Sequence, residues 1–256
     1  MTDAAATIDP YDAVAALDWQ IELGADEAIG DDPVNRYEVK PAPKPSAPAA
    51  PSIPPQQPSV PPTEQIAESC TSLDALHAAI AAFDGCELKQ GARNLVFADG
   101  LRGSRVMIVG EAPGREEDIQ GLPFVGPSGQ LLDKMFAAIG LSRKADDPVN
   151  GIYITNTLPW RPPQNRDPSS DELTMMLPFL HRHIELAAPE ILITMGNPST
   201  KTLLQTTSGI TRLRGNWVEV KGIATLPMFH PAALLRDPLK KREAWADLLA
   251  LKARLT

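Results

Sequence analysis

The sequence predicts an α/β fold, a three-layer sandwich in which helices cover both faces of a central parallel four-stranded sheet. Four short apolar segments alternate with longer segments whose apolar residues recur at helical spacing. Such an alternation favours a mainly parallel sheet. Polar loops rich in glycine and proline directly follow three of the four segments. In parallel sheets, ligands bind at the edge formed by the carboxyl ends of the strands, so these loops are expected to form a site.

The predicted strands are short runs dominated by apolar residues. They cover residues 106–109, 152–155, 191–195 and 224–228. The predicted helices cover residues 73–83, 128–139, 171–186, 198–204 and 239–255. In the second helix, four apolar residues face inward: Leu131, Leu132, Met135 and Phe136. Asp171 or a preceding serine caps the third helix.

Length and composition bound the kind of protein. The chain has 256 residues, of which 43% are hydrophobic, which is enough for one sizeable core. It has no apolar run long enough to cross a bilayer and no amino-terminal secretion signal, so we expect a cytoplasmic protein with no membrane partner. Cys70 and Cys86 are its only cysteines, and they imply no disulfide framework. A monomer is the default expectation.

The first 62 residues differ in composition from the rest. Residues 1–40 form an acidic segment, and ten of the 26 prolines fall in residues 41–62, which predicts an extended linker. Residues 1–62 carry −7 of the net charge of −8, so residues 63–256, the predicted folded domain, are near neutral. Residues 11–23 are compatible with a short amphipathic helix that docks a protein partner, and equally with a weakly ordered tail.

The loop after the first strand, GEAPGREED, is rich in carboxylates. Glu111 stands at the strand end, and Glu116, Glu117 and Asp118 follow. This cluster suits a reaction that develops positive charge, such as formation of an oxocarbenium-like sugar. An ordinary strand-to-helix turn is the plainer interpretation. A nucleotide-binding loop, and with it an oxidoreductase, is disfavoured because the G-x-G-x-x-G pattern is missing and the acids would repel a pyrophosphate.

Three other loop residues have both a structural and a functional interpretation. Phe124, in GLPFVG, is either a core residue or a platform on which a base stacks. Asn156, at the end of the second strand, is either a turn residue or a donor and acceptor that reads a base edge. His230 follows the fourth strand and is pinned by a proline. A lone histidine is usually structural, but one at a strand end is a candidate for catalysis.

Basic and apolar residues in the same loops are candidates for DNA contacts. Arg161 and Arg166, in RPPQNR, are placed to hold phosphates. Leu234 and Leu235 form an apparently exposed pair that is suited to wedge into a duplex, while Arg236 meets its backbone. His181 and His183 point apart on their helix, so we assign them no role as metal ligands, and no metal site is predicted.

Taken together, GEAPGREED with GLPFVGPSGQLLD, YITN with RPPQNR, and MFHPAALLR resemble the family 4 uracil-DNA glycosylases in order and spacing. The resemblance covers roughly residues 85–256. It implies the uracil-DNA glycosylase fold and a monofunctional enzyme of base excision repair that flips uracil out of DNA and hydrolyses its N-glycosidic bond. It also implies uracil-containing DNA, single- or double-stranded, as the partner, and in a bacterium a location at the nucleoid.

The resemblance also implies roles for individual residues. Phe124 is similar to the residue that stacks on the uracil, and Asn156 to the residue that pairs with its edge. His230 is similar to the residue that stabilises the departing uracil anion. The remaining matches are Glu111 and Asn165, which are similar to residues near the water that hydrolyses the bond, and Glu117 and Ala112, which are similar to residues that line the base pocket. A histidine that bonds covalently to DNA in some relatives has no counterpart in RPPQNRDPSSDE, so free release of uracil is expected.

One departure from the family concerns its [4Fe–4S] cluster, which four cysteines usually hold. The ligand positions fall on Phe83, Cys86, Trp160 and a residue near Met176, so only one of the four is a cysteine. A cubane cluster needs thiolates at its irons. We therefore predict a protein without the cluster and with no other cofactor, in which apolar side chains fill the volume. Two alternatives stay open: a catalytically silent module that binds damaged DNA, and a glycosylase with a broader range of deaminated bases.

Overall fold

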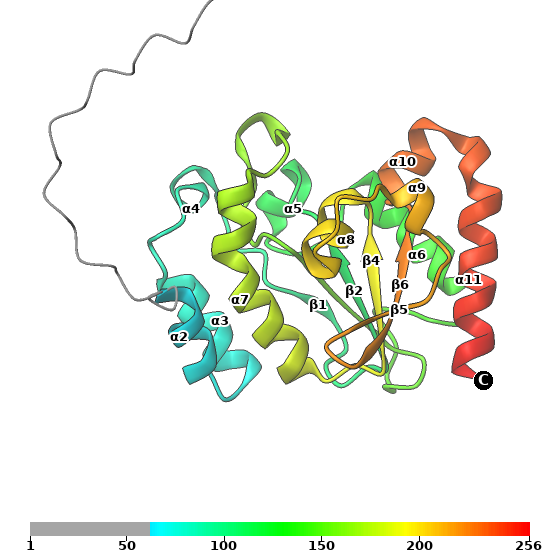
Figure 1. The fold of residues 1–256 in the computed structure, drawn as a ribbon, viewed down its shortest axis with the longest axis horizontal. Coiled ribbons are helices and arrows are strands. Elements are labelled where there is room, and N and C mark those ends of the chain that lie inside the picture. Colours follow the sequence, from blue (N-terminus) through cyan, green and yellow to red (C-terminus); the bar gives the residue numbers. More distant parts are fainter. Residues whose placement is uncertain (1–61) are drawn as a thin grey trace, which may run out of the picture. The chain divides into compact units, whose positions relative to one another are not determined.

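The computed structural model describes residues 62–256 (Figure 1). The acidic segment at residues 1–40, the helix predicted at residues 11–23 and almost all of the predicted linker lie outside the described residues, so these calls stay predictions. The first described element is helix α2, Pro62–Ser69, and it begins at the last residue of that linker. Within residues 62–256, no helix combines the length and the apolar character needed to cross a bilayer.

The centre of the fold is a mixed, mostly parallel sheet of six strands in the order β1-β3-β2-β4-β6-β5. The four predicted strands are confirmed as its parallel interior: β2 (Val106–Gly110), β3 (Ile152–Asn156), β4 (Ile191–Met195) and β6 (Ile223–Met228). The prediction of only four strands is wrong. Two short antiparallel strands, β1 (Asp99–Gly100) and β5 (Val218–Val220), pair with the outer strands β3 and β6.

Helices cover both faces of the sheet, so the three-layer prediction is confirmed. Helices α6 (Pro127–Ala137) and α11 (Lys241–Leu255) pack on one face through Leu132, Phe136, Leu248 and Leu251. Helices α7 (Ser170–Ala187) and α8 (Asn197–Leu204) pack on the other face. Alternate strand residues serve the two layers, because successive side chains of a strand point to opposite faces. All five residues of β2, β3 and β4 are buried, as expected for strands covered on both sides.

A further apolar cluster joins the beginning of the domain to helix α7. Helices α2, α3 (Leu73–Ala82) and α4 (Leu88–Gly91) contribute Ala67, Leu76, Ile80 and Leu88, which pack with Phe179 of α7. In Figure 1 these helices lie on the α7 side of the sheet, where α2 and α3 run beside α7. This cluster fixes the start of the loop that follows β3, because Leu158 and Trp160 belong to it.

Short helices form the carboxyl edge of the sheet, where loops were expected. They are α5 (Arg115–Gln120), the 3-10 turn η1 (Pro163–Asn165), α9 (Ile210–Leu213), α10 (Pro231–Arg236) and the 3-10 turn η2 (Pro238–Lys240). Helix α5 begins where the Gly114 N–H donates to Glu117, and it ends at Gly121, whose φ of 72° suits glycine. Residues of three of these elements, α5, η1 and α10, line one cavity.

Candidate functional site

A cavity of about 340 Å³ opens at the carboxyl edge of the sheet. Its wall is built by the loops after β2, β3 and β6 together with the loop before α6. The lining includes these predicted site residues: Glu111, Ala112, Glu117, Phe124, Asn156, Asn165, Arg166, His230 and Arg236. Residues separated by more than a hundred positions therefore meet in one place, as the rule for ligand sites of parallel sheets predicts.

The Glu117 carboxylate ties the first loop to the loop that carries Phe124. Its Oε2 accepts from the Gly114 N–H at 3.2 Å. Its Oε1 accepts from the N–H groups of Val125 at 3.0 Å and Gly126 at 2.9 Å. Three main-chain donors hold this carboxylate in one position. Glu117 therefore lines the cavity and also organises its wall.

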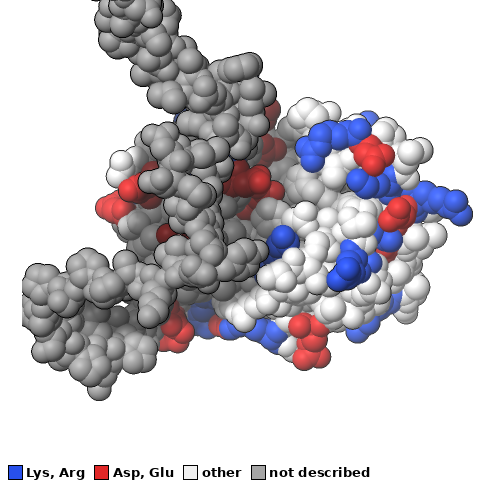
Figure 2. All heavy atoms as spheres, turned by 45° about the horizontal axis from the view of Figure 1, so that its top comes forward, with Lys and Arg blue, Asp and Glu red and all other residues white. Residues whose placement is uncertain are grey.

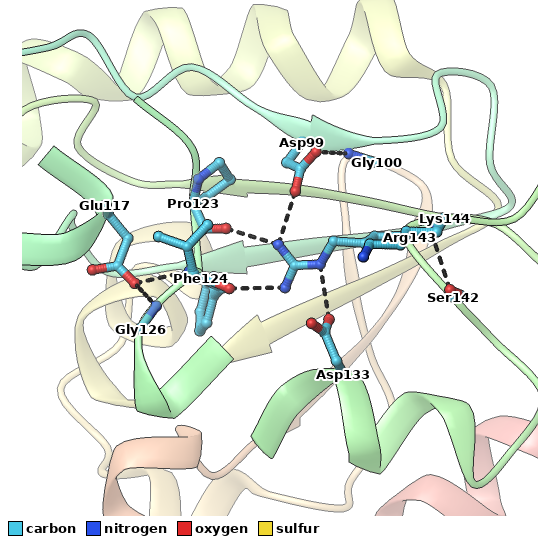
Figure 3. Close-up of polar contacts among 11 residues, drawn as sticks. Asp99, Gly100, Glu117, Pro123, Phe124, Gly126, Asp133, Ser142, Arg143 and Lys144 are labelled. Carbon is cyan, nitrogen blue, oxygen red and sulfur yellow. Dashed lines mark hydrogen bonds and ion pairs between the residues drawn. The ribbon is translucent and has the colours of Figure 1, made fainter. Parts of the chain in front are cut away.

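Phe124 is 5% exposed and has a φ of 53°, in the left-handed region that a bulky residue rarely adopts. Such a backbone costs on the order of 1–3 kcal/mol and persists only where neighbouring contacts impose it. One such contact is with Gly129 of α6: the Phe124 carbonyl can lie against this residue only because glycine has no Cβ, which would collide with the carbonyl. Arg143 provides another: its guanidinium donates to the carbonyls of Pro123 and Phe124, each at 2.9 Å (Figure 3).

His230 is the amino-terminal cap of α10 and lies against the Phe124 ring, with ring centroids 5.3 Å apart and planes inclined by 29°. Its Nδ1 accepts from the Ala232 N–H at 3.1 Å, so the proton of the neutral ring is on Nε2. Burial, with a smaller contribution from Arg236, lowers the pKa of His230 to about 4. At neutral pH the ring is therefore an uncharged donor through Nε2.

Asn156 ends β3 beside the end of β2, with Gly110 as its partner in the sheet register. The amide is buried, and a Cβ built on Gly110 would meet both Asn156 Oδ1 and the Phe124 ring. The absence of a side chain at Gly110 therefore lets the amide and the aromatic ring both pack closely against the end of β2, and both line the cavity. A planar base in the cavity would need both groups, because it would stack on one while it hydrogen-bonds to the other.

Replacing Gly110 with alanine should lower activity at this site by at least about tenfold, because the methyl group would overlap with the Asn156 amide and the Phe124 ring and would displace groups that a base would contact. The measurement is kcat/KM on the substrate identified below. Gly91→Ala is the matched control, since a Cβ on Gly91 meets nothing within 4 Å. Equal activity of Gly110→Ala and Gly91→Ala would show that activity does not depend on the close packing of Asn156 and Phe124 at Gly110.

Glu111 and Asn165 both line the cavity. Burial, followed by repulsion from Asp167, raises the pKa of Glu111 above its usual value. Asn165 lies in the η1 turn, with a φ of 55°, and its Oδ1 accepts from Arg161 Nε at 2.8 Å. The amide nitrogen of Asn165 is left as a donor, because its oxygen is engaged by the guanidinium.

The predicted phosphate-binding arginines differ in their surroundings. Arg161 is committed to Asn165, and Arg166 pairs with Glu172 through two hydrogen bonds of 2.6 and 2.9 Å. This pairing lowers the pKa of Glu172 to about 2. Arg236 is exposed at the cavity rim. Figure 2, turned toward the carboxyl edge, shows Lys and Arg side chains spread around a largely uncharged area on the part of the face that described residues form.

The prediction that Leu234 and Leu235 are both exposed is wrong. Leu234 is 1% exposed and packs with Ile210, Phe229 and Ala244, because the helical turn of α10 points it inward. Leu235 is 46% exposed. A wedge role is thus restricted to Leu235, for which it stays a prediction.

The four positions that hold the iron–sulfur cluster in the resembled family meet in one apolar cluster. Cys86, Trp160 and Met176 are each no more than 2% exposed, and Phe83 packs against them with its ring 5.5 Å from that of Phe179. Burial raises the pKa of the Cys86 thiol, which opposes a thiolate. Within residues 62–256, no group of three or more metal-ligating side chains is gathered. The residues present do not fit a cubane cluster.

One buried polar pair near the site has no signal in the sequence. His183 is 3% exposed, its Nε2 lies 3.0 Å from the Tyr153 hydroxyl, and burial lowers its pKa to about 3 while raising that of Tyr153 to about 12. The His183 ring also stacks on Phe97 at 4.4 Å. The pair is neutral and packs inside the layer between α7 and the sheet, so it has a structural role.

Comparison with known proteins places this cavity in a family. Residues 97–249 match the uracil DNA glycosylase superfamily. The chain is 39% identical over 176 residues to a type-4 uracil-DNA glycosylase of Sulfurisphaera tokodaii, which covers 65% of this chain and 77% of the relative. It is 36% identical to type-4 uracil-DNA glycosylases of Archaeoglobus fulgidus and Saccharolobus solfataricus, over 69% and 72% of this chain and 89% and 87% of the relatives. The chain therefore belongs to the uracil DNA glycosylase superfamily.

Proposed function

We propose that the protein is a monofunctional uracil-DNA glycosylase that removes uracil from DNA and leaves an abasic site. The observation that carries this proposal is the cavity of about 340 Å³ that Phe124, Asn156, His230 and Glu111 line together at the carboxyl edge of the sheet. An aromatic face, an amide and a neutral donor are the groups needed to bind a flipped uracil. Family membership supports DNA as the partner.

In the proposed reaction the uridine nucleotide leaves the helix, which costs a few kcal/mol of stacking and pairing. Phe124 stacks on the base and Asn156 reads its edge. As the C1′–N1 bond breaks, the electron pair moves to the base, and His230 Nε2–H donates to its O2 oxygen. A water oxygen then bonds to C1′, and Glu111 accepts the proton that this water loses. Solvent protonates the released uracil anion.

The neutral state of His230 decides how it acts. With a pKa of about 4 it does not carry the proton needed for a general acid at neutral pH. It acts instead as a fixed dipole aimed at an oxygen that becomes negative, and a preorganised donor of this kind is worth more than the same group in water. The nearby carboxylates favour the cationic sugar, so the two developing charges face groups of opposite polarity.

The raised pKa of Glu111 predicts the pH dependence. Glu111 must be ionised to accept a proton, so kcat/KM should fall as the pH falls through a pKa above the usual 4.5 of a glutamate. His230 stays neutral until the pH approaches 4, so it does not produce this fall. In Glu111→Gln the plateau should drop and this acid limb should disappear. Glu116→Gln, an exposed position on α5, is the control that keeps it. An unchanged limb in Glu111→Gln would assign the titration to another group.

We also propose that the enzyme works without an iron–sulfur cluster. The apolar contacts of Trp160 and Met176 support this, because they occupy positions at which the cluster would need thiolates. Protein purified without oxygen should contain less than about one iron per ten chains. It should also keep its excision rate after dialysis against a chelator. A brown protein with stoichiometric iron would contradict the proposal.

The test of the proposed function is excision from a labelled oligonucleotide that contains one deoxyuridine, both single-stranded and in a duplex opposite guanine. Cleavage at the uracil after alkali treatment is the expected result. Tight binding without cleavage would indicate a damage-recognition module, and equal rates on hypoxanthine or on thymine opposite guanine would indicate a broader base range. If the protein neither binds nor cleaves this DNA, the proposal is overturned.

A further inference from the structure

Arg143 is a buried arginine outside the cavity, in the connection between α6 and β3. Its side chain is only 7% exposed. The guanidinium contacts four oxygens: Asp133 Oδ1 from Nε at 2.8 Å, Asp99 Oδ2 and the Pro123 carbonyl from Nη1 at 2.9 Å each, and the Phe124 carbonyl from Nη2 at 2.9 Å (Figure 3). The planar fork of donors is thus almost fully used.

These four oxygens come from three separate parts of the fold. Asp99 belongs to the edge strand β1, and Asp133 belongs to helix α6. The two carbonyls belong to the loop that carries Phe124. The two carboxylates compensate the buried positive charge and hold the guanidinium in one orientation. Arg143 therefore links the loop to the sheet edge on one side and to α6 on the other.

The Phe124 loop is held by charged groups on both sides. Arg143 binds the carbonyls of Pro123 and Phe124, while the Glu117 carboxylate binds the N–H groups of Val125 and Gly126. Consecutive peptide groups are thus fixed by opposite charges. A main chain held at a φ of 53° needs such contacts, because the left-handed conformation is unfavourable for phenylalanine.

We propose that Arg143 is a positioning residue that sets the Phe124 ring in place for stacking on the flipped base. This inference rests on the proposed function. Arg143 is not part of the cavity lining, so it acts only through Phe124 and its loop. Glu117, by contrast, lines the cavity and holds the same loop from the side opposite Arg143 (Figure 3).

The variant Arg143→Lys tests this role. Lysine keeps the charge, but its single ammonium does not reproduce a fork that reaches two carboxylates and two carbonyls. Arg105→Lys is a matched control. Arg105 also binds a carboxylate, Glu190 Oε2 at 2.8 Å, and a main-chain carbonyl, that of Leu255 at 3.1 Å, but it precedes β2 at the opposite edge of the sheet.

The decisive experiment is a double-mutant cycle measured by single-turnover excision. Arg143→Lys should lower the rate by about tenfold in the wild-type background, since stacking on an aromatic ring is worth that much or more. In the Phe124→Ala background the same change should lower the rate by less than about twofold, because the group it positions is gone. Arg105→Lys should have a small and equal effect in both backgrounds. Equal losses from Arg143→Lys in both backgrounds would overturn the proposal.

A second measurement does not depend on activity. The aromatic NMR signals of Phe124, assigned with Phe124→Ala, should shift in Arg143→Lys and stay unchanged in Arg105→Lys, because the nearby His230 ring makes them sensitive to position. Unshifted signals would overturn the proposal for Arg143, whatever the activity of the protein. A wild-type protein that excises no uracil would contradict only the proposed function. If Arg143→Lys does not fold, Asp133→Asn removes one of its four contacts and should give a smaller change of the same kind.

Discussion

Uracil excision should fall by about a hundredfold to a thousandfold when His230 is replaced with alanine, because the loss of one preorganised donor to a developing anion has an effect of this size. The ring is neutral and donates through Nε2, since its Nδ1 is engaged by the Ala232 N–H. No other neutral imidazole lines the cavity in the described part of the chain. The measurement is the single-turnover rate at saturating enzyme, which separates chemistry from product release.

Two further variants separate catalysis from stability. His230 caps α10, and loss of a cap costs about 1 kcal/mol of stability. His230→Ser supplies a good capping side chain without the Nε2 donor, so it should be more stable than His230→Ala and equally slow. His181→Ala, on the surface of α7, should excise uracil normally. Recovery of the rate in His230→Ser would mean that the cap, and not the donor, matters.

Asn156→Leu should lower kcat/KM by about a hundredfold, because it removes both the donor and the acceptor that read the uracil edge while it keeps the branched shape of the side chain. Asn156 is 6% exposed and its backbone is paired in the sheet, so the substitution leaves the fold intact. The base should still stack on Phe124. We therefore expect the variant to bind uracil-containing DNA but to discriminate poorly among bases.

Asn150→Leu is the control for this effect. Asn150 also uses its side-chain amide, which donates to Asp147, but it lies before β3 at the opposite edge of the sheet. Its loss should leave excision unchanged. A rate within a fewfold of wild type for Asn156→Leu would mean that main-chain groups read the base, and the assignment of Asn156 would be wrong.

The interior of the sheet could be predicted from the sequence because its strands are buried on both faces. The predicted strand at residues 191–195 coincides with β4, and the other three differ by one residue at one end. The edge strands β1 and β5 were missed because two and three residues, with Asp99 and Glu219 among them, carry no readable hydrophobic period. The acidic sequence of α5 resembled a loop, because the helix has only six residues and begins after Gly114, which has no capping side chain.

The candidate site could be predicted as far as it follows from strand ends. Glu111, Asn156 and His230 each follow a parallel strand, so the topology alone brings them together. Arg143 gave no such signal, because it lies in a connection before a strand and its four partners are distant in the sequence. The burial of Leu234 depends on the turn of α10, which a run of two leucines and one arginine does not reveal.

The arrangement of the outer strands has a consequence for association between molecules. An exposed, long edge strand offers unpaired main-chain groups on which another chain can build, and this is a common origin of aggregation. In the described domain, the parallel strands β3 and β6 are each partly covered by a neighbour of only two or three residues. Each covering strand carries an acidic side chain, Asp99 or Glu219. The ends of the sheet therefore present short, charged templates that discourage the addition of a further strand.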